Sequence, residues 1–123
     1  LLWDSRLYAY DGKLKIGRNC AFHACHVNAS GGEIIIGDNV SINYDCHIGA
    51  INKIVIGNNV LLASRIFITD HFHGGTTDED LEIPPSKRIL VSKGPVIIED
   101  NVWIASGCII SAGVKSKPRR SER

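Results

Sequence analysis

The sequence predicts an all-β fold in which most of the chain forms a parallel β-solenoid of triangular coils. A four-residue motif, made of an aliphatic, a small or acidic, a variable residue and an asparagine, occurs four times in the 123 residues. A unit this short cannot bury its own apolar side, so copies of it must stack on one another. The motifs are Ile16-Gly17-Arg18-Asn19, Ile36-Gly37-Asp38-Asn39, Ile56-Gly57-Asn58-Asn59 and Ile98-Glu99-Asp100-Asn101.

A finer period of six residues follows each motif and predicts the shape of a coil. Three such hexads make one triangular turn, which gives about four coils, at 16–33, 36–53, 56–73 and 98–115. In the last three coils an aliphatic residue begins every hexad, and in most hexads the fifth position is small or apolar. We expect these two positions to point inward and fill a three-sided prism. The fifth-position residues are Val40, Cys46, Val60, Ile66, Val102, Cys108 and Val114.

The ends of the repeat region and its first coil are less regular. Residues 1–15 are predicted to be an N-terminal lead-in, and 16–115 the hexapeptide-repeat domain. In the first coil, Phe22 and Asn28 occupy hexad starts in place of aliphatic residues. The basic stretch 116–123 follows the last hexad and is predicted to be a disordered tail.

One long insertion, residues 74–97, separates the third and fourth coils. Gly74-Gly75, the Pro84-Pro85 pair and a run of acidic residues oppose regular strand pairing, so the segment is expected to be a loop. Loops this long within compact domains usually have a function.

Composition excludes several classes of protein. The net charge is +1, and the basic residues gather in one terminal run rather than over a surface with aromatic side chains, which argues against nucleic-acid binding. No apolar run approaches the roughly 18 residues that a membrane span needs, and no signal peptide opens the chain, so a cytoplasmic location is expected. The four cysteines suit packing in the interior, and no metal is expected because their spacing lacks two separated pairs of ligands.

The hexads, together with the string Asn101-Val102-Trp103-Ile104-Ala105-Ser106-Gly107 after an excursion that holds His71 and His73, resemble the hexapeptide-repeat acyltransferases. Within that family the chain is most similar to the maltose, galactoside and polysaccharide O-acetyltransferases. The resemblance implies a left-handed parallel β-helix. It also implies a homotrimer of parallel prisms with active sites in the grooves between neighbours, where the insertion reaches over the groove and shapes the acceptor pocket.

Acetyl transfer from acetyl-CoA to a sugar hydroxyl requires a general base, because an alcohol is a weak nucleophile until its proton is removed. Histidine suits this task. Counted without gaps from Val60, the family's base corresponds to His73, which we prefer, whereas the Asp-His-Xaa-His string allows His71 to act and His73 to bind the acceptor. Both histidines are expected to project outward, with Phe72 inward between them. Asp70 is a candidate to orient an imidazole or to bind substrate.

Two further segments carry candidate site residues by resemblance. Asn43 and Asp45 belong to the part of the second coil that meets the acceptor sugar in the sugar acetyltransferases. Here a carboxylate replaces the second asparagine of that segment, and it accepts hydrogen bonds from hydroxyls but cannot donate them. The donor groove corresponds to Trp103, Ala105, Ser106 and Gly107. Trp103 would line it, the Ser106 N–H would polarise the thioester carbonyl, and Gly107 would allow close approach.

The sequence therefore predicts an acyl-CoA-dependent O-acetyltransferase that acts on a sugar or polysaccharide acceptor by direct transfer. The alternative is a catalytically silent trimeric scaffold, or a fragment lacking the C-terminal coils that hold CoA in relatives. A third interpretation, metal-dependent hydration as in the γ-class carbonic anhydrases, requires three histidines that converge across a subunit boundary, and His71 and His73 lack the spacing used there.

Overall fold

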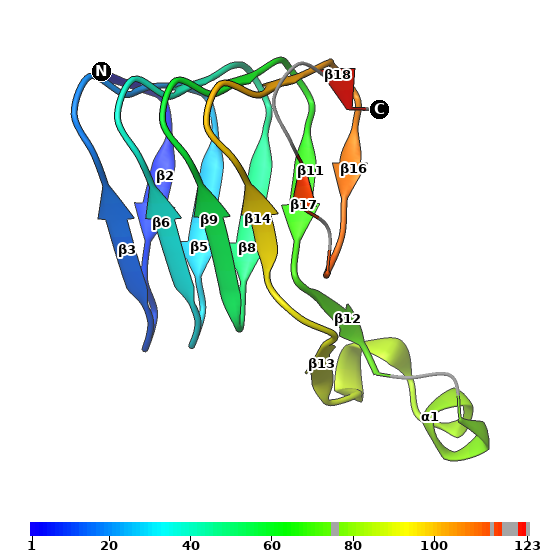
Figure 1. The fold of residues 1–123 in the computed structure, drawn as a ribbon. Coiled ribbons are helices and arrows are strands. Elements are labelled where there is room, and N and C mark those ends of the chain that lie inside the picture. The colour runs from blue at the N-terminus through cyan, green and yellow to red at the C-terminus, as the bar shows by residue number, and fades with distance from the viewer. Residues whose placement is uncertain (75–76, 114, 117–120, 123) are drawn as a thin grey trace.

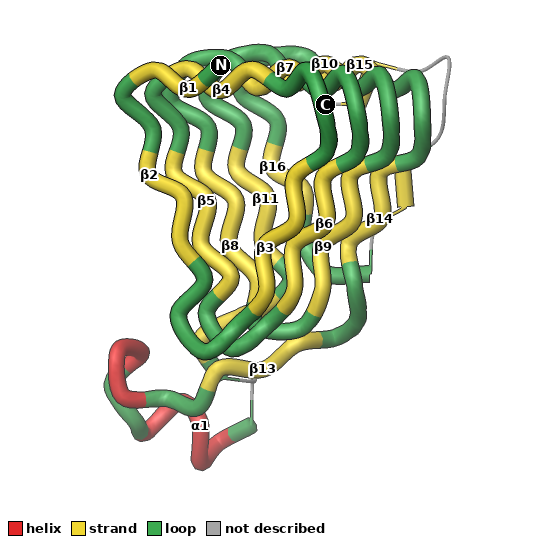
Figure 2. The backbone as a smooth tube through the Cα atoms, turned by 90° about the vertical axis from the view of Figure 1, so that its left-hand side faces the viewer, coloured by secondary structure: helices red, strands yellow, loops and turns green. Residues whose placement is uncertain are grey.

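The computed structural model describes residues 1–74, 77–113, 115–116 and 121–122. It confirms the predicted fold class: parallel strands stack along one axis into a solenoid (Figure 1). Figure 2 shows the prism from the side, with three flat faces that meet at three corners. We name the faces sheet A, sheet B and sheet C, in the order in which the chain first enters them.

The strands of each sheet come from successive coils, and neighbouring strands pair in parallel. Sheet A contains, in spatial order, β1 (Leu2–Trp3), β4 (Ala21–His23), β7 (Ser41–Ile42), β10 (Leu61–Leu62), β15 (Trp103–Ile104) and β18 (Ser121–Glu122). Sheet B contains β2 (Arg6–Tyr8), β5 (His26–Ala29), β8 (His47–Ala50), β11 (Phe67–Thr69) and β16 (Ile109–Ile110). Sheet C contains β3 (Lys13–Ile16), β6 (Glu33–Ile36), β9 (Lys53–Ile56), β14 (Val96–Ile98) and β17 (Lys115–Ser116).

The core is a set of apolar columns that run along the prism axis, as the hexads predict. Ile42, Leu62 and Ile104 form one column behind sheet A, and each is fully buried. Such burial contributes about 1.5–3 kcal/mol for each large aliphatic side chain relative to exposure. The predicted fifth-position residues Val40, Cys46, Val60, Ile66, Val102 and Cys108 are all buried, and Val114 lies outside the described residues.

The asparagine of the repeated motif has a conformational role at the corner between sheets C and A. Asn39, Asn59 and Asn101 adopt positive φ angles of 59°, 57° and 60°. Asparagine tolerates this left-handed region better than most residues with a side chain. The residue before it accepts a hydrogen bond from the preceding coil, since the Asp38 N–H donates to Asn58 Oδ1 at 2.8 Å. The motif therefore turns the chain and links the coils.

The coil predicted at 16–33 differs from the prediction in which residues of its sheet B strand point inward. Val27 is fully buried and Asn28 lies on the outer face of sheet B, although Asn28 was expected to point inward. The cause is the corner between sheets A and B, where Ala24 alone occupies the place that Tyr44 and Asp45 share one coil later. This shorter corner shifts the residues of β5 by one position, and the register is restored at the next corner, where Glu33 pairs with Lys53.

The solenoid extends beyond the predicted repeat region at both ends. Residues 1–15, predicted as a lead-in, contain β1, β2 and most of β3, which pair in parallel with β4, β5 and β6. At the other end, β17 extends into the first residue of the predicted tail and pairs with β14, and β18, within that tail, pairs with β15.

The insertion is not the unpaired loop that was expected. β12 (His71–His73) pairs antiparallel with β13 (Leu90–Ser92), and this ribbon projects from the corner between sheets B and C (Figure 1). Phe72, predicted to point inward, lies in this ribbon and is 40% exposed. Beyond the ribbon lie a short helix, α1 (Asp78–Glu82), and a 3-10 turn, η1 (Pro85–Lys87).

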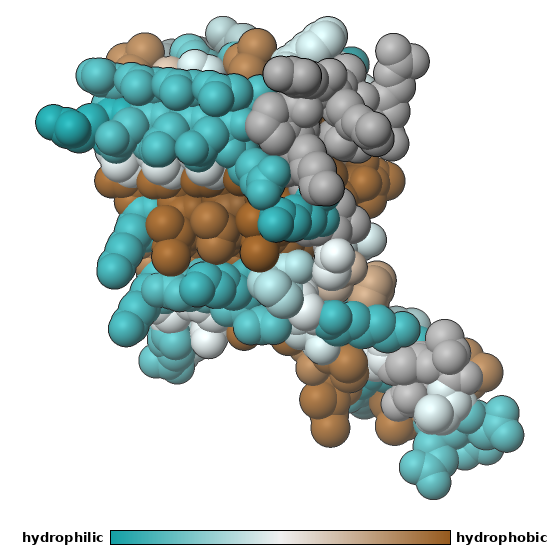
Figure 3. All heavy atoms as spheres, viewed as in Figure 1, coloured by the Kyte–Doolittle hydropathy of each residue, from teal (hydrophilic) through white to brown (hydrophobic). Residues whose placement is uncertain are grey.

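The outer face of sheet C carries an apolar band bordered by charged side chains (Figure 3). The band is formed by Ile35, Val55 and Ile97, which are paired neighbours and partly buried. Beside it, Lys53 Nζ lies 3.7 Å from Glu33 Oε1. In the described part of the chain no helix is both long and apolar enough to cross a membrane.

Candidate functional site

The corner between sheets B and C is organised by a buried carboxylate, that of Asp70. This residue is fully buried. At the end of sheet B it occupies the place that Ala29 and Ala50 occupy in the two preceding coils. Its Oδ1 accepts a hydrogen bond from the Ile51 N–H at 3.0 Å, and its Oδ2 accepts from the N–H groups of Asn52 and Lys53, both at 2.7 Å. Because the carboxylate is enclosed, it is not available for direct contact with a sugar, and it acts on the site only through its neighbours.

His71 is one of those neighbours. Its Nδ1 lies 2.9 Å from Asp70 Oδ1 and 3.1 Å from Thr69 Oγ1, and its side chain is 19% exposed. A carboxylate only accepts, so Nδ1 carries the proton and Nε2 presents its lone pair. No described residue forms a hydrogen bond with Nε2. An imidazole held in one tautomer, with an unused nitrogen, has the arrangement of a general base oriented by a carboxylate.

His73 lies in a different environment, two residues further along β12. It is exposed, and its backbone pairs with Leu90 in the antiparallel ribbon. Among the described residues its side chain has no carboxylate or other hydrogen-bond partner. The preference for His73 from the gapless count therefore has no geometric counterpart, because the chain leaves the solenoid at Asp70 and the count assumes an unbroken coil.

Two histidines on the outer face of sheet B next to His71, His26 and His47, were not among the predicted site residues. His47 stacks on Phe67, with ring centroids 5.0 Å apart and planes at 7°, and meets His26 edge to face at 4.8 Å. Burial lowers the pKa of His47, and the nearby His26 and His71 lower it further. His26 and His47 pair across β5 and β8, so the signal was their equivalent position one coil apart.

Asn43 and Asp45 lie at the corner between sheets A and B. The Asn43 N–H donates to Leu62 O of the next coil at 3.0 Å, which extends the hydrogen bonding between β7 and β10. The residue is partly exposed. Asp45 is exposed and adopts a φ of 61°, with its N–H on Ala24 O at 3.3 Å. Tyr44 between them is 49% exposed. This corner presents an amide, a phenol ring and a carboxylate to solvent.

The predicted donor segment lies at the same corner, two coils further along. Trp103 is 52% exposed on the outer face of sheet A, where it pairs with Leu61, and Ala105 packs against the core. Ser106 is exposed, and its Oγ accepts from the Ser64 N–H at 3.2 Å. Gly107 adopts a φ of 81° in the turn, and a Cβ at this position would meet nothing within 4 Å. The glycine thus serves the turn and leaves open space beside it.

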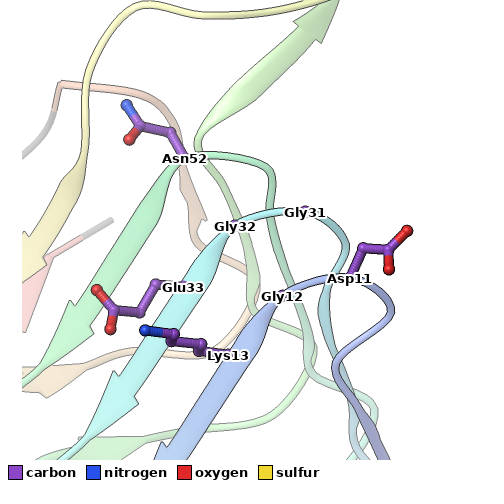
Figure 4. Close-up of a pocket in the computed structure, with 7 residues that line it drawn as sticks. All are labelled: Asp11, Gly12, Lys13, Gly31, Gly32, Glu33 and Asn52. Atoms are coloured by element: carbon purple, nitrogen blue, oxygen red, sulfur yellow. The ribbon is translucent and has the colours of Figure 1, made fainter.

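A single chain does not bring these groups together. His71 lies at the corner where strands of sheet B end, whereas Asn43, Asp45 and Ser106 lie at the corner where those strands begin, on the other side of the face (Figure 2). A separate hollow of about 350 Å³ opens between the loops of the early coils, lined by Asp11, Gly12, Lys13, Gly31, Gly32, Glu33 and Asn52 (Figure 4). It contains none of the predicted site residues. Within the described residues no group of three or more His, Cys, Asp and Glu side chains is arranged to hold a metal ion.

The chain is similar to a protein of Escherichia coli strain K12 that bears the name "Putative lipopolysaccharide biosynthesis O-acetyl transferase WbbJ". The two are 37% identical over 115 residues, an alignment that covers 85% of this chain and 59% of the relative. The chain thus spans less than two thirds of that protein's length. No family model and no solved structure matches the chain. The hexapeptide period, the parallel solenoid interrupted by one long insertion, and this similarity are consistent with a hexapeptide-repeat acetyltransferase.

Proposed function

We propose that this protein transfers an acetyl group from acetyl-CoA to a hydroxyl of a sugar or polysaccharide, with His71 as the general base. The observation that carries the proposal is the imidazole of His71, whose Nδ1 is held by Asp70 while Nε2 is unused. The named role of the Escherichia coli relative in lipopolysaccharide biosynthesis supports a saccharide acceptor.

In the proposed reaction the acceptor oxygen attacks the thioester carbonyl carbon while His71 Nε2 takes the hydroxyl proton. The negative charge develops on the carbonyl oxygen of a tetrahedral intermediate, and a backbone N–H such as that of Ser106 is suited to stabilise it. The carbon–sulfur bond then breaks, and the CoA thiolate leaves with the proton that the imidazolium returns. The products are the acetyl ester and CoA, and His71 is regenerated.

Direct transfer is favoured over a covalent acyl-enzyme because no cysteine is available as a nucleophile. Cys20, Cys25, Cys46 and Cys108 are all buried, with exposed fractions of 7%, 3%, 2% and 4%. A thiol enclosed in the core cannot reach a thioester.

Asp70 is proposed to position the base rather than to bind the sugar. Three backbone N–H groups and one imidazole N–H converge on its two oxygens. This arrangement fixes the carboxylate, and the fixed carboxylate in turn fixes the tautomer and the direction of His71. His73, on the exposed ribbon, is proposed to contact the acceptor.

A complete site requires more than one copy of the chain, and we propose a homotrimer. The base and the acceptor and donor segments lie at different corners of one prism, so parallel copies packed corner to corner would bring His71 of one beside Asn43, Asp45 and Trp103 of the next. Trp103, exposed on a flat sheet, offers an apolar wall for the acyl group and its thiol arm. An acetyl-CoA donor implies that the reaction takes place in the cytoplasm.

Replacing His71 and His73 singly by alanine tests this proposal, with release of CoA thiol measured in the presence of a sugar acceptor. Loss of a general base lowers kcat by about a hundredfold or more, so His71→Ala should show that loss while His73→Ala changes mainly KM for the acceptor. Full activity in both variants would refute a histidine base, and a loss confined to His73→Ala would move the role to His73. Calorimetric titration with acetyl-CoA separates an enzyme from a silent scaffold, which would not bind it.

A further inference from the structure

The corner between sheets A and B carries an exposed aromatic cluster that extends from the second coil back to the N-terminal strand. It consists of Trp3, His23 and Tyr44, which we call the aromatic platform. Trp3 is 55% exposed and Tyr44 is 49% exposed. Their ring centroids lie 5.9 Å apart with planes at 75°, and His23 lies 5.3 Å from Tyr44. Two large rings left half in solvent on one patch usually mark a contact surface.

The short corner at Ala24 explains how these rings meet. Trp3 pairs with His23 across β1 and β4, whereas Tyr44 belongs to the following coil. Ala24 occupies the corner where the next coil has two residues, Tyr44 and Asp45. Because the side chain of Ala24 is small, it does not separate Tyr44 from the rings of Trp3 and His23. The platform is therefore produced by the same length difference that shifts the register of this coil.

The platform is held rigidly by the backbone beneath it. Trp3 O accepts hydrogen bonds from the Ala24 N–H at 2.7 Å and from Ser5 Oγ at 3.1 Å. Ser5 Oγ in turn accepts from the Cys25 N–H at 3.0 Å. These bonds fix the backbone of Trp3, and its ring contacts that of Tyr44, so less conformational freedom is lost when a ligand covers the pair.

We propose that the aromatic platform binds sugar units of the acceptor away from the reacting hydroxyl, so that the acceptor is an extended glycan rather than a single sugar. Aromatic rings pack against the C–H faces of sugars, and carboxylates accept hydrogen bonds from hydroxyls. Both kinds of group are present, because the exposed residues Asp4 and Asp45 directly follow Trp3 and Tyr44 in the chain. An apolar protein partner would fit this border of carboxylates poorly.

The spacing of the coils sets the length of the glycan. Strands of a sheet lie about 4.8 Å apart, and three steps separate β2, in the coil of Trp3, from β11, in the coil of His71, which amounts to roughly 14 Å along the axis. One sugar ring does not span this distance. The inference rests on the proposed saccharide acceptor, and it extends the proposed acceptor segment at Asn43 and Asp45 to Trp3 and His23, which the chemical step does not use.

Binding can be tested without turnover, on an array that carries bacterial O-polysaccharide fragments as single sugars and as longer oligosaccharides. The unmodified chain should bind the longer fragments, and Trp3→Ala should weaken that binding about tenfold or more, which corresponds to the loss of one stacking contact. The matched control is Tyr10→Ala, which removes a 74% exposed ring of the same coil outside the platform and should bind as the unmodified chain does. Trp3→Phe, which keeps a ring, should retain most of the binding.

Fluorescence provides a second measurement that is independent of the array surface. The chain contains two tryptophans, so the variant Trp103→Phe leaves Trp3 as the sole reporter. Addition of the longer fragments should change its emission, and single sugars should not.

Several results would overturn the inference. Equal binding by Trp3→Ala and the unmodified chain, equal affinity for single sugars and oligosaccharides, or no binding to any fragment would each do so. A change of oligomeric state in Trp3→Ala, seen by sedimentation, would instead assign the platform to contact with a second copy. Failure of the proposed function looks different, because inactive chains with an intact platform would still bind the array.

Discussion

At the scale of single residues, Asp70 combines a structural role with a role in the site. It is fully buried, and three backbone N–H groups of the neighbouring coil donate to its oxygens. In Asp70→Asn one acceptor oxygen becomes an NH₂ group that faces donors. We expect the free energy of unfolding to fall by about 2–4 kcal/mol, because a buried donor is left opposite other donors. Urea denaturation measures this change.

Asp100→Asn is the matched control for Asp70→Asn. Asp100 Oδ1 accepts one hydrogen bond, from the Asn58 N–H at 2.6 Å, and an asparagine performs the same task one coil earlier. The side-chain amide retains the acceptor, so we expect a change of less than about 0.5 kcal/mol. Equal destabilisation of the two variants would contradict the special role assigned to Asp70.

His47 makes stability depend on pH. Its pKa in the folded chain is lowered by burial and by the neighbouring His26 and His71. The unfolded chain, with a histidine pKa of about 6.5, therefore binds the proton more readily, and stability falls as the pH drops through that value. We expect His47→Gln to lose less stability than the unmodified chain between about pH 7.5 and 5.5.

Thermal unfolding at a series of pH values measures the dependence attributed to His47. The variant His73→Gln changes an exposed histidine of the ribbon and should keep the pH dependence of the unmodified chain. An unchanged slope in His47→Gln would show that the pH dependence arises elsewhere.

The inward residues of the later coils could be predicted from sequence because period and burial coincide there. Ile42, Leu62 and Ile104 confirm this. The different environments of His71 and His73 could not be predicted. They depend on the hydrogen bonds that hold Asp70 in the prism, whose donors lie in a coil some 20 residues earlier in the chain.

At the scale of elements, the turn between sheets C and A depends on backbone contact at the glycine of the motif. A Cβ at Gly57 would lie 2.3 Å from Asp100 Oδ1 and less than 3.0 Å from the backbone of the next coil. We expect Gly57→Ala to reduce the free energy of unfolding by about 1–3 kcal/mol, because the coils must move apart. Gly49→Ala is the comparison, since its Cβ would have ordinary contacts at 3.6 and 3.9 Å.

Melting temperatures of the two alanine variants check this difference. Gly49→Ala should unfold within a few degrees of the unmodified chain, and a larger loss there than in Gly57→Ala would contradict the packing argument. The Gly49 position also adjoins the rings of His47 and His71, so its variant reports whether added bulk beside the proposed base alters activity at constant stability.

Strands could be predicted where the six-residue period determines them. They could not be predicted where they depend on pairing with a segment far along the chain. Glycines and prolines indicated that the coils are interrupted in this region, although Val96 and Ile97, within the predicted insertion, already lie in β14 of sheet C. The pairing of Leu90 with His73 bridges a gap that no local pattern reports. The short corner at Ala24 could not be predicted either, because a hexad count assumes that all corners have the same length.

At the scale of the whole molecule, the proposed site needs two copies, and this makes complementation possible. His71→Ala and Asp45→Ala remove groups at different corners of the prism, so each homotrimer should have little activity. When the two variants are unfolded together and reassembled, one site in four pairs an intact His71 with an intact Asp45. We expect roughly a quarter of the unmodified activity in the mixture.

Turnover in the reassembled mixture, compared with each variant reassembled alone, measures this complementation. Sedimentation shows in parallel whether the species is a trimer. Activity no greater than the sum of the separate variants would mean that both residues act within one chain, or that Asp45 has no part in the site.

The way in which the insertion joins the prism has a consequence for how such a protein can change. The chain leaves sheet B after β11, travels out along β12, returns along β13 and enters β14 in register with β9. The outgoing strand β12 and the returning strand β13 are paired, so the coils can keep their arrangement whatever segment connects these two strands. The segment between β12 and β13 can therefore be exchanged while the coils and the proposed base His71 keep their places.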